Sequence, residues 1–120
     1  MHRLLLLTIA TSLRANSATT MTEALVIQSV DFEVFGRVQG VFFRKYTKDQ
    51  ADKLGLRGWC MNTSKGTVSG HIQGPTDKME SMMHWLKTTG SPSSQIDKAD
   101  FKNRKEIADY TYDNFSIKKD

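Results

Sequence analysis

Residues 30–44 read VDFEVFGRVQGVFFR, and the change of periodicity within this stretch decides the fold. Apolar and acidic side chains alternate over residues 30–34, which is typical of a β-strand with one buried face. Residues 37–42 then predict a loop. Apolar residues near helical spacing predict a helix over residues 43–54, with Gly55 as its end. The apolar positions of this helix are Phe43, Tyr46, Ala51 and Leu54.

The next part of the chain predicts a β-hairpin over about residues 56–74. Residues 56–61 form its first strand. The Asn, Ser and Gly residues within 62–66 are suited to a tight turn. Apolar and polar residues alternate over residues 67–73, which gives the second strand.

A second helix is predicted to open at Pro75 and to close at Gly90. Proline is tolerated at the first helical position because its missing N–H would have no partner there. Hydrophobic residues recur at i, i+3, i+4 and i+7 and give the helix one apolar face. They are Met79, Met82, Met83 and Leu86. Residues 95–103 predict a short strand, and residues 110–117 predict the last strand, with a bulge where its apolar phase changes.

The predicted element order is therefore β-α-β-β-α-β, with an extra short strand before the last one. Two helices and a sheet that each have an apolar face must bury those faces against one another. A chain of 120 residues has room for one such core. We therefore expect a single two-layer α+β domain over residues 28–118.

The composition excludes several classes of protein. The net charge is +4, and Arg3 and Arg14 contribute two of these charges, so the remainder favours small anionic substrates and does not demand a nucleic-acid partner. Cys60 is the single cysteine, which excludes an internal disulfide and a cysteine zinc cluster and indicates a reducing compartment. No apolar run approaches the roughly 20 residues that a bilayer requires, so we expect no membrane partner.

The loop before the first helix is a candidate anion site. A helix N-terminus offers free N–H groups with the helix dipole behind them, and Gly40 lets successive amides point inward. Arg44 lies in the first helical turn, where its guanidinium could donate two parallel hydrogen bonds to the same anion. Taken alone, a loop with two glycines is more often only a connection. A bound anion would, however, explain an arginine at a helix end where the dipole disfavours cations.

Asn62 is a second candidate residue. Taken alone, Asn62 is better explained as a turn residue. If it is functional, its neutral amide could orient a water molecule.

Other candidates have simpler structural explanations. Cys60 and the methionines of the second helix fit core positions, and the strand glycines fit bulges or close approaches. The histidines show no metal-ligand spacing.

Two segments together resemble a known family. Residues 34–44 (VFGRVQGVFFR) closely resemble the first signature of animal acylphosphatases, and residues 58–70 (GWCMNTSKGTVSG) resemble the second. Residues 112–117 (YDNFSI) are similar to the family's ending. The resemblance runs through residues 28–118, and the two signatures at this separation are far more specific than either one alone.

This resemblance implies a ferredoxin-like βαββαβ sandwich with an antiparallel sheet and two helices on one face. It implies a monomeric enzyme that hydrolyses the carboxyl-phosphate bond of small acyl phosphates, without a metal or an organic cofactor. Arg44 would bind the phosphate and Asn62 would position the attacking water. The amides that cradle the phosphate would be those of Gln39, Gly40, Val41, Phe42 and Phe43. Met61 stands where a basic residue often precedes the Asn, which we expect to alter only the local charge.

Residues 1–22 fall outside the resemblance and form an N-terminal extension. Its Leu-rich composition without acidic residues fits a signal peptide, a mitochondrial presequence, or an upstream start with Met21 as the usual initiator. Asn62 lies in a glycosylation sequon, and a glycan there would block the candidate site. We therefore expect a cytoplasmic protein, with mitochondrial targeting by the extension as the alternative.

Two other functions are compatible with part of this sequence. The βαββαβ order also serves RNA-recognition modules of the RRM type, but these carry their stacking aromatics on a strand, whereas the aromatic and basic residues here cluster over residues 41–46. The second rival is a catalytically silent interaction domain. The presence of both Arg44 and Asn62 argues against it.

Overall fold

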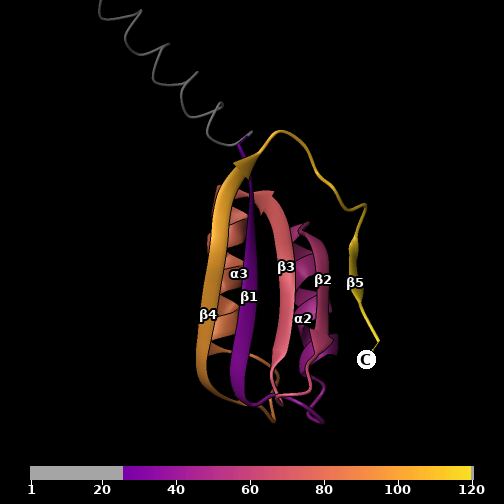
Figure 1. The fold of residues 1–120 in the computed structure, drawn as a ribbon, viewed down its shortest axis with the longest axis vertical. Helices are drawn as coiled ribbons and strands as arrows, with labels where there is room; N and C mark the ends of the chain where they lie inside the picture. Colours follow the sequence, from indigo (N-terminus) through magenta and orange to yellow (C-terminus); the bar gives the residue numbers. More distant parts are fainter. Residues whose placement is uncertain (1–25, 120) are drawn as a thin grey trace, which may run out of the picture.

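The computed structural model describes residues 26–119, so the predicted extension over residues 1–22 lies outside the described residues. The elements are β1 (Ile27–Arg37), α2 (Phe43–Leu54), β2 (Arg57–Asn62), β3 (Val68–Pro75), α3 (Thr76–Thr88), β4 (Gln95–Ile107) and β5 (Phe115–Ile117). Both helices cover one face of a five-stranded sheet with the strand order β4-β1-β3-β2-β5 (Figure 1). The predicted two-layer α+β sandwich is therefore confirmed.

The neighbouring inner strands β1 and β3 supply much of the core. Val30, Phe32 and Val34, the apolar half of the alternating pattern in β1, are at most 3% exposed. Val68 and Ile72 of β3 are fully buried beside them. Because successive strand residues point to opposite faces, these side chains pack beneath the helices while the polar residues between them lie on the open face.

Helix α2 buries a narrower stripe than the sequence predicted. Its buried residues are Phe43, Thr47 and Ala51, four residues apart, whereas Tyr46 is 39% exposed. The burial of Thr47 is possible because its hydroxyl donates a hydrogen bond of 2.7 Å to the carbonyl of Phe43. The predicted end of the helix is confirmed, since Gly55 is its left-handed C-cap with φ 71°.

Helix α3 packs its methionine face into the core. Met79, Met82, Met83 and Leu86 are all buried, as their spacing predicted. The helix begins at Thr76, and Pro75 is the extended residue before it (φ −60°, ψ 148°). The prediction that Pro75 opens the helix was therefore wrong by one residue, because Pro75 still pairs with Ile27 as the last residue of β3.

The C-terminal strands differ most from the prediction. The strand predicted over residues 95–103 extends to Ile107 and is the fourth strand of the βαββαβ order, antiparallel to β1. The strand predicted over residues 110–117 is confined to Phe115–Ile117, so the added strand is the last one. Residues 108–114 form bends and irregular backbone, so the bulge that was expected there does not occur.

The sequence predicted an antiparallel sheet, but one pair of strands, β2 and β5, is parallel. Phe115, Ser116 and Ile117 of β5 pair with residues 58–60 of β2 in the same direction. The chain crosses from β4 over the top of the sheet to reach this opposite edge (Figure 1). This crossing brings the C-terminal residues beside β2, where they meet the start of α2.

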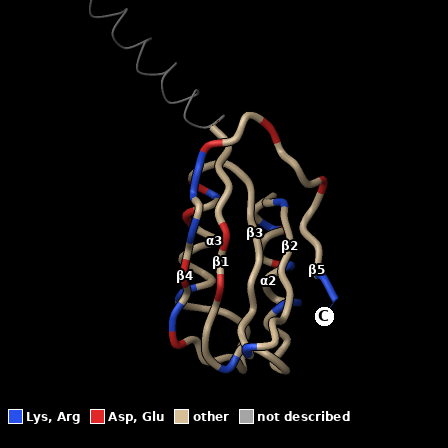
Figure 2. Tube along the Cα trace, in the orientation of Figure 1, with Lys and Arg blue, Asp and Glu red and all other residues tan. Residues whose placement is uncertain are grey.

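The two bulges of the sheet lie in the pairing of β1 with the outermost strand, β4. The first falls between Ser29 and Asp31, where Asn103 adopts φ 59° and its amide donates to the Asp31 carboxylate at 2.9 Å. The second falls at Gly36 (φ 128°), where any Cβ would collide with the main-chain carbonyl of Gln95. Only glycine fits this close approach. Charged residues of both signs line the outer strand (Figure 2).

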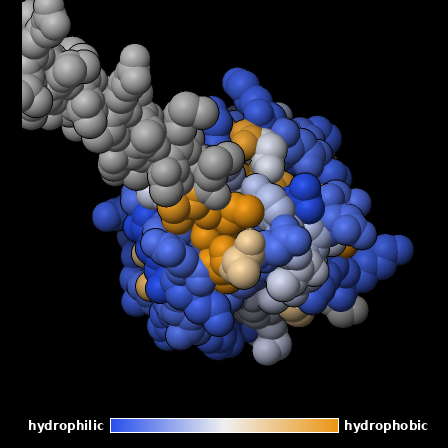
Figure 3. Space-filling model, turned by 90° about the horizontal axis from the view of Figure 1, so that it is seen from above, coloured by the Kyte–Doolittle hydropathy of each residue, from blue (hydrophilic) through white to orange (hydrophobic). Residues whose placement is uncertain are grey.

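The two ends of the sheet differ in character. At the end where β1 begins, hydrophobic residues are visible within an otherwise hydrophilic surface (Figure 3). Half-buried Ile27 and Ile107, which pair across β1 and β4, belong to this end. The opposite end carries the loop between β1 and α2. Within residues 26–119, no helix is long and apolar enough to cross a bilayer.

Candidate functional site

A pocket of about 550 Å³ opens at the end of the sheet where β1 runs into α2. Its lining comes from the β1–α2 loop, the first turn of α2, the end of β2 and the C-terminal strand. The lining residues are Val38, Gly40, Phe42, Phe43, Arg44, Lys45, Asn62, Ile117 and Lys119. Among the described residues, the lining contains Arg44, Lys45 and Lys119 and no Asp or Glu, so the pocket suits an anion.

The β1–α2 loop has the geometry of an anion-binding concavity. Gly40 and Phe42 both adopt left-handed conformations, with φ values of 74° and 60°. Within residues 26–119, the main-chain N–H groups of residues 39–43 have no hydrogen-bond acceptor. They precede a 12-residue helix whose first turn holds no acidic residue. Such N–H groups and the positive end of a helix dipole together favour a bound anion.

Arg44 and Asn62 meet in this pocket although they are 18 positions apart in the sequence. Arg44 stands in the first turn of α2, and Asn62 is the last residue of β2. The Oδ1 atom of Asn62 is buried and, among the described residues, has no hydrogen-bond partner. A buried acceptor without a partner costs about 1–3 kcal/mol, which a bound water or ligand would recover.

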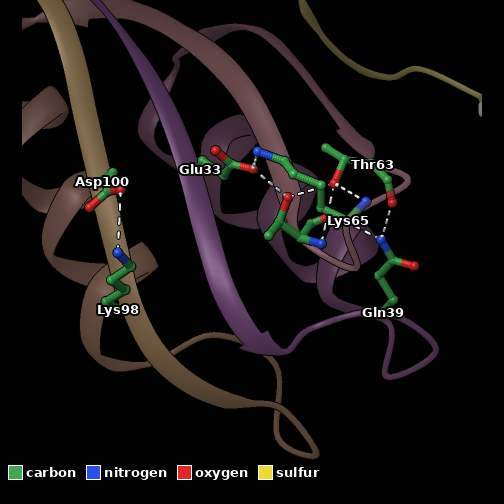
Figure 4. Close-up of polar contacts among 7 residues, drawn as sticks. Glu33, Gln39, Thr63, Lys65, Lys98 and Asp100 are labelled. Atoms are coloured by element: carbon green, nitrogen blue, oxygen red, sulfur yellow. Dashed lines mark hydrogen bonds and ion pairs between the residues drawn. The ribbon is translucent and has the colours of Figure 1, made fainter.

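The five residues of the predicted cradle take different places. Gly40, Phe42 and Phe43 line the pocket together with Arg44 and Asn62, whereas Gln39 and Val41 are absent from the lining. The Gln39 side chain points away toward the β2–β3 turn (Figure 4). Its Nε2 donates hydrogen bonds to the carbonyls of Thr63 (2.8 Å) and Thr67 (2.9 Å). This clamp was not predicted, because no local pattern joins residues so distant in sequence.

A second set of polar contacts fixes the same turn to β1 (Figure 4). The Thr67 hydroxyl donates to the Glu33 carboxylate at 2.6 Å, and Lys65 Nζ lies 3.0 Å from the same oxygen. The hydrogen bond from Thr67, and then that from Lys65, hold the pKa of Glu33 below its ordinary value of 4.5. Thr63 Oγ1 lies 2.6 Å from Thr67 Oγ1 and accepts the N–H of Lys65.

Cys60 belongs to the core, as the sequence indicated. It is fully buried in β2, and burial raises the pKa of its thiol to about 12. A neutral buried thiol is a poor nucleophile. His71 contacts Asp31 at 2.7 Å on the open face of the sheet. Within residues 26–119 the structure contains no cluster of three or more His, Cys, Asp or Glu residues that could hold a metal ion.

Several lining residues were missed by the sequence reasoning. Ile117 and Lys119 reach the pocket only because β5 pairs in parallel with β2 and extends toward the start of α2. The sequence carries no signal for a parallel partner of a three-residue strand. Lys45 also lines the pocket, although its Nζ lies 3.0 Å from Asp49 Oδ2 one helical turn further on.

Fold and pocket define the class of protein: a ferredoxin-like α+β domain with a cationic pocket at a helix N-terminus. The family model described as acylphosphatase matches residues 30–117. Acylphosphatase-2 from Homo sapiens is 58% identical over 98 residues, which cover 82% of this chain and 99% of that relative. Acylphosphatase-1 from Homo sapiens is 54% identical over 99 residues, covering 82% and 100%.

Solved structures agree with the sequence relatives. The structure of an acylphosphatase from Coxiella burnetii superimposes with a TM-score of 0.67 at 31% identity and covers 78% of this chain and 94% of that one. The chain belongs to the acylphosphatase family. It is an enzyme that hydrolyses acyl phosphates, which confirms the activity implied by the two sequence signatures.

Proposed function

We propose that the main-chain N–H groups of residues 39–43 and the guanidinium of Arg44 hold the phosphoryl group of the substrate. Asn62 orients the water that attacks phosphorus from the side opposite the leaving carboxylate. The observation that carries this proposal is one pocket lined by Gly40, Phe42 and Phe43 of this loop together with Arg44 and Asn62. Within residues 26–119, the N–H groups of the loop have no acceptor and the buried Oδ1 of Asn62 has no partner. Each well-aimed donor in such a site contributes about 3 kcal/mol to the transition state.

The reaction needs little covalent chemistry from the protein. The water oxygen forms a bond to phosphorus, and the bond between phosphorus and the acyl oxygen breaks with its electron pair leaving on the carboxylate. The proton of the water passes to a phosphate oxygen. A carboxylate is a good leaving group, so no strong general acid is required, and catalysis rests on positioning and on charge neutralisation.

We extend the proposal to the whole chain. The domain spans residues 28–118, preceded by an extension over residues 1–22, and acts as a monomer on a small acyl phosphate. A nucleic-acid partner is disfavoured because the net charge of +4 is too small to demand one. A single buried cysteine supports a cytoplasmic location, with mitochondrial targeting by the extension as the alternative.

Separate roles for the two side chains can be tested with benzoyl phosphate as substrate and inorganic phosphate as inhibitor. We expect Arg44→Ala to abolish both turnover and inhibition by phosphate. We expect Asn62→Ala to lose turnover and to keep phosphate inhibition, because Asn62 acts on the water. Circular dichroism of both variants checks that the domain stays folded. Loss of phosphate binding in Asn62→Ala before loss of turnover would contradict this division of roles.

A further inference from the structure

The loop that joins α3 to β4 carries a buried serine that contacts the β1–α2 loop. Ser91 is 2% exposed. Its hydroxyl donates a hydrogen bond of 2.7 Å to the main-chain carbonyl of Val41, which lies 50 positions earlier in the sequence. Ser91 is absent from the pocket lining, so any effect that it has on the reaction must pass through the β1–α2 loop.

Ser91 is itself fixed by the loop to which it belongs. Its carbonyl accepts hydrogen bonds from the main-chain N–H of Ser94 at 3.0 Å and from the Ser94 hydroxyl at 2.7 Å. The preceding residue, Gly90, has φ 63°, and a Cβ there would collide with Phe43 and Ile96. The α3–β4 loop is therefore packed tightly against the start of α2, and the hydroxyl of Ser91 is offered at a defined place.

The hydrogen bond from Ser91 orients the peptide unit between Val41 and Phe42. The C=O and N–H of a trans peptide unit point to opposite sides. A Val41 carbonyl that is held by Ser91 therefore turns the N–H of Phe42 away from the α3–β4 loop. Within residues 26–119 this N–H has no acceptor, and Phe42 lines the pocket.

The conformation of Phe42 opposes this orientation. Its φ of 60° and ψ of 24° lie in the left-handed region, which is disfavoured for a residue with a Cβ. Rotation of the 41–42 peptide unit by half a turn would bring φ of Phe42 to negative values and relieve the strain. The same rotation would turn the carbonyl oxygen of Val41 toward the pocket in place of the N–H, and its partial negative charge would repel a phosphate. The hydrogen bond from Ser91 opposes that rotation.

We propose that Ser91 is a positioning residue for catalysis. Its hydroxyl holds the peptide unit between Val41 and Phe42 in the orientation that presents the Phe42 N–H to the phosphoryl group. This inference rests on the proposed function, in which the amides of the loop bind that group. Because the N–H contacts the phosphoryl group before and during the reaction, both phosphate affinity and turnover depend on Ser91.

The test compares Ser91→Ala with Ser94→Ala. The first variant removes the donor to Val41, whereas the second removes a hydroxyl of the same loop and leaves the Ser94 N–H on the Ser91 carbonyl. We expect Ser91→Ala to raise the inhibition constant of inorganic phosphate about ten-fold and to lower kcat/KM for benzoyl phosphate about 100-fold. Ser94→Ala should keep both wild-type values. Ser91→Cys keeps the buried volume with a weaker donor, so it should change both values in the same direction by smaller factors.

Amide NMR of the full chain separates positioning from structural support. Inorganic phosphate should move the Phe42 N–H proton resonance of the wild type downfield, and Ser91→Ala should lose this shift. The inference is overturned if Ser91→Ala keeps the shift and the inhibition constant, even if its free energy of unfolding falls. Equal losses in Ser91→Ala and Ser94→Ala would overturn it as well, because they would show a general loosening of the loop.

The same spectra distinguish this failure from that of the proposed function. If only the role of Ser91 is wrong, the Phe42 N–H of the wild type still responds to phosphate, and it responds equally in Ser91→Ala. If the loop amides do not bind the phosphoryl group, the Phe42 N–H of the wild type does not respond to phosphate at all.

Discussion

The side-chain amide of Gln39 donates a 2.8 Å hydrogen bond to the main-chain carbonyl of Thr63, the residue after Asn62. The same nitrogen reaches the carbonyl of Thr67 at 2.9 Å. The loop of candidate N–H groups is thereby tied to the turn that follows Asn62. One side chain therefore sets the spacing between the two halves of the site.

Substitution of Gln39 tests this spacing. Gln39→Glu would place a carboxylate against two carbonyl oxygens, so we expect kcat for benzoyl phosphate to fall about 100-fold, as small displacements in active sites do. Gln39→Met removes the donors without adding charge, so its kcat should fall less than that of Gln39→Glu. If Gln39 acts by positioning Asn62, the double variant Gln39→Met with Asn62→Ala loses no more turnover than Asn62→Ala alone. Additive losses in steady-state kinetics would contradict the positioning role.

Gly36 supplies a prediction about stability. A Cβ at this position would collide with the main-chain carbonyl of Gln95, so we expect Gly36→Ala to lower the free energy of unfolding by at least about 3 kcal/mol. Gly55→Ala is the matched control, since Gly55 also has a positive φ but has open space around it. It should cost about 1–2 kcal/mol. Urea unfolding measures the free energy of unfolding of both variants. Equal losses would show that the positive φ of Gly36, and not the close approach of the Gln95 carbonyl, determines the cost of Gly36→Ala.

Glu33 gives the fold a pH dependence. Its pKa is lowered in the folded protein, first by the hydrogen bond from Thr67 and then by Lys65. A carboxyl with a lowered pKa stabilises the fold above its ordinary value of 4.5, and this stability is lost as the pH falls through the folded-state pKa. Glu33→Gln should therefore be less stable than the wild type at pH 7, and the difference between their free energies of unfolding should decrease below pH 4.5. If urea titrations give a constant difference across this range, the carboxyl of Glu33 does not cause the pH dependence.

His71 should carry its proton on Nδ1. The main-chain N–H of Thr111 donates to Gln73 Oε1, which leaves Gln73 Nε2 facing His71 Nε2 at 3.0 Å. Because that amide nitrogen is a donor, His71 Nε2 must accept, and Nδ1–H donates to Asp31 at 2.7 Å. Nitrogen-15 NMR of the ring at pH 8 distinguishes the two tautomers. A proton on Nε2 would mean that the Gln73 amide is oriented the other way.

The first two-thirds of the fold could be predicted because its patterns are local. Apolar and acidic side chains alternate over residues 30–34, and these residues lie in a strand as predicted. Met79 and Leu86 lie on the buried face of a helix, and Gly55 ends a helix, also as predicted. β4 was underestimated because its residues are mostly polar and exposed, so no apolar alternation marks its length. Its extent follows from pairing with β1, which is a tertiary contact.

The sequence motifs predicted the central residues of the candidate site but not the residues that other segments bring to its edge. The loop before α2, Arg44 and Asn62 follow from motifs. Gly40, Phe42 and Phe43 of that loop line one pocket with Arg44 and Asn62, whereas Gln39 and Val41 do not. Ile117 and the clamp of Gln39 depend on which distant segments the fold brings together. Tyr46 was misplaced because its aromatic ring suggested burial, whereas the smaller Thr47 fits the space beneath the helix.

The outermost strand β4 has a consequence for how copies of this protein meet in concentrated solution. Its 13 residues leave a long row of main-chain groups that a second molecule could extend into a continuous sheet. Lys98, Asp100 and Lys102 stand along this row, and the bulge at Asn103 disrupts the straight register that strand addition needs. Neutralising those charges would therefore favour pairing of β4 with the edge of a second molecule.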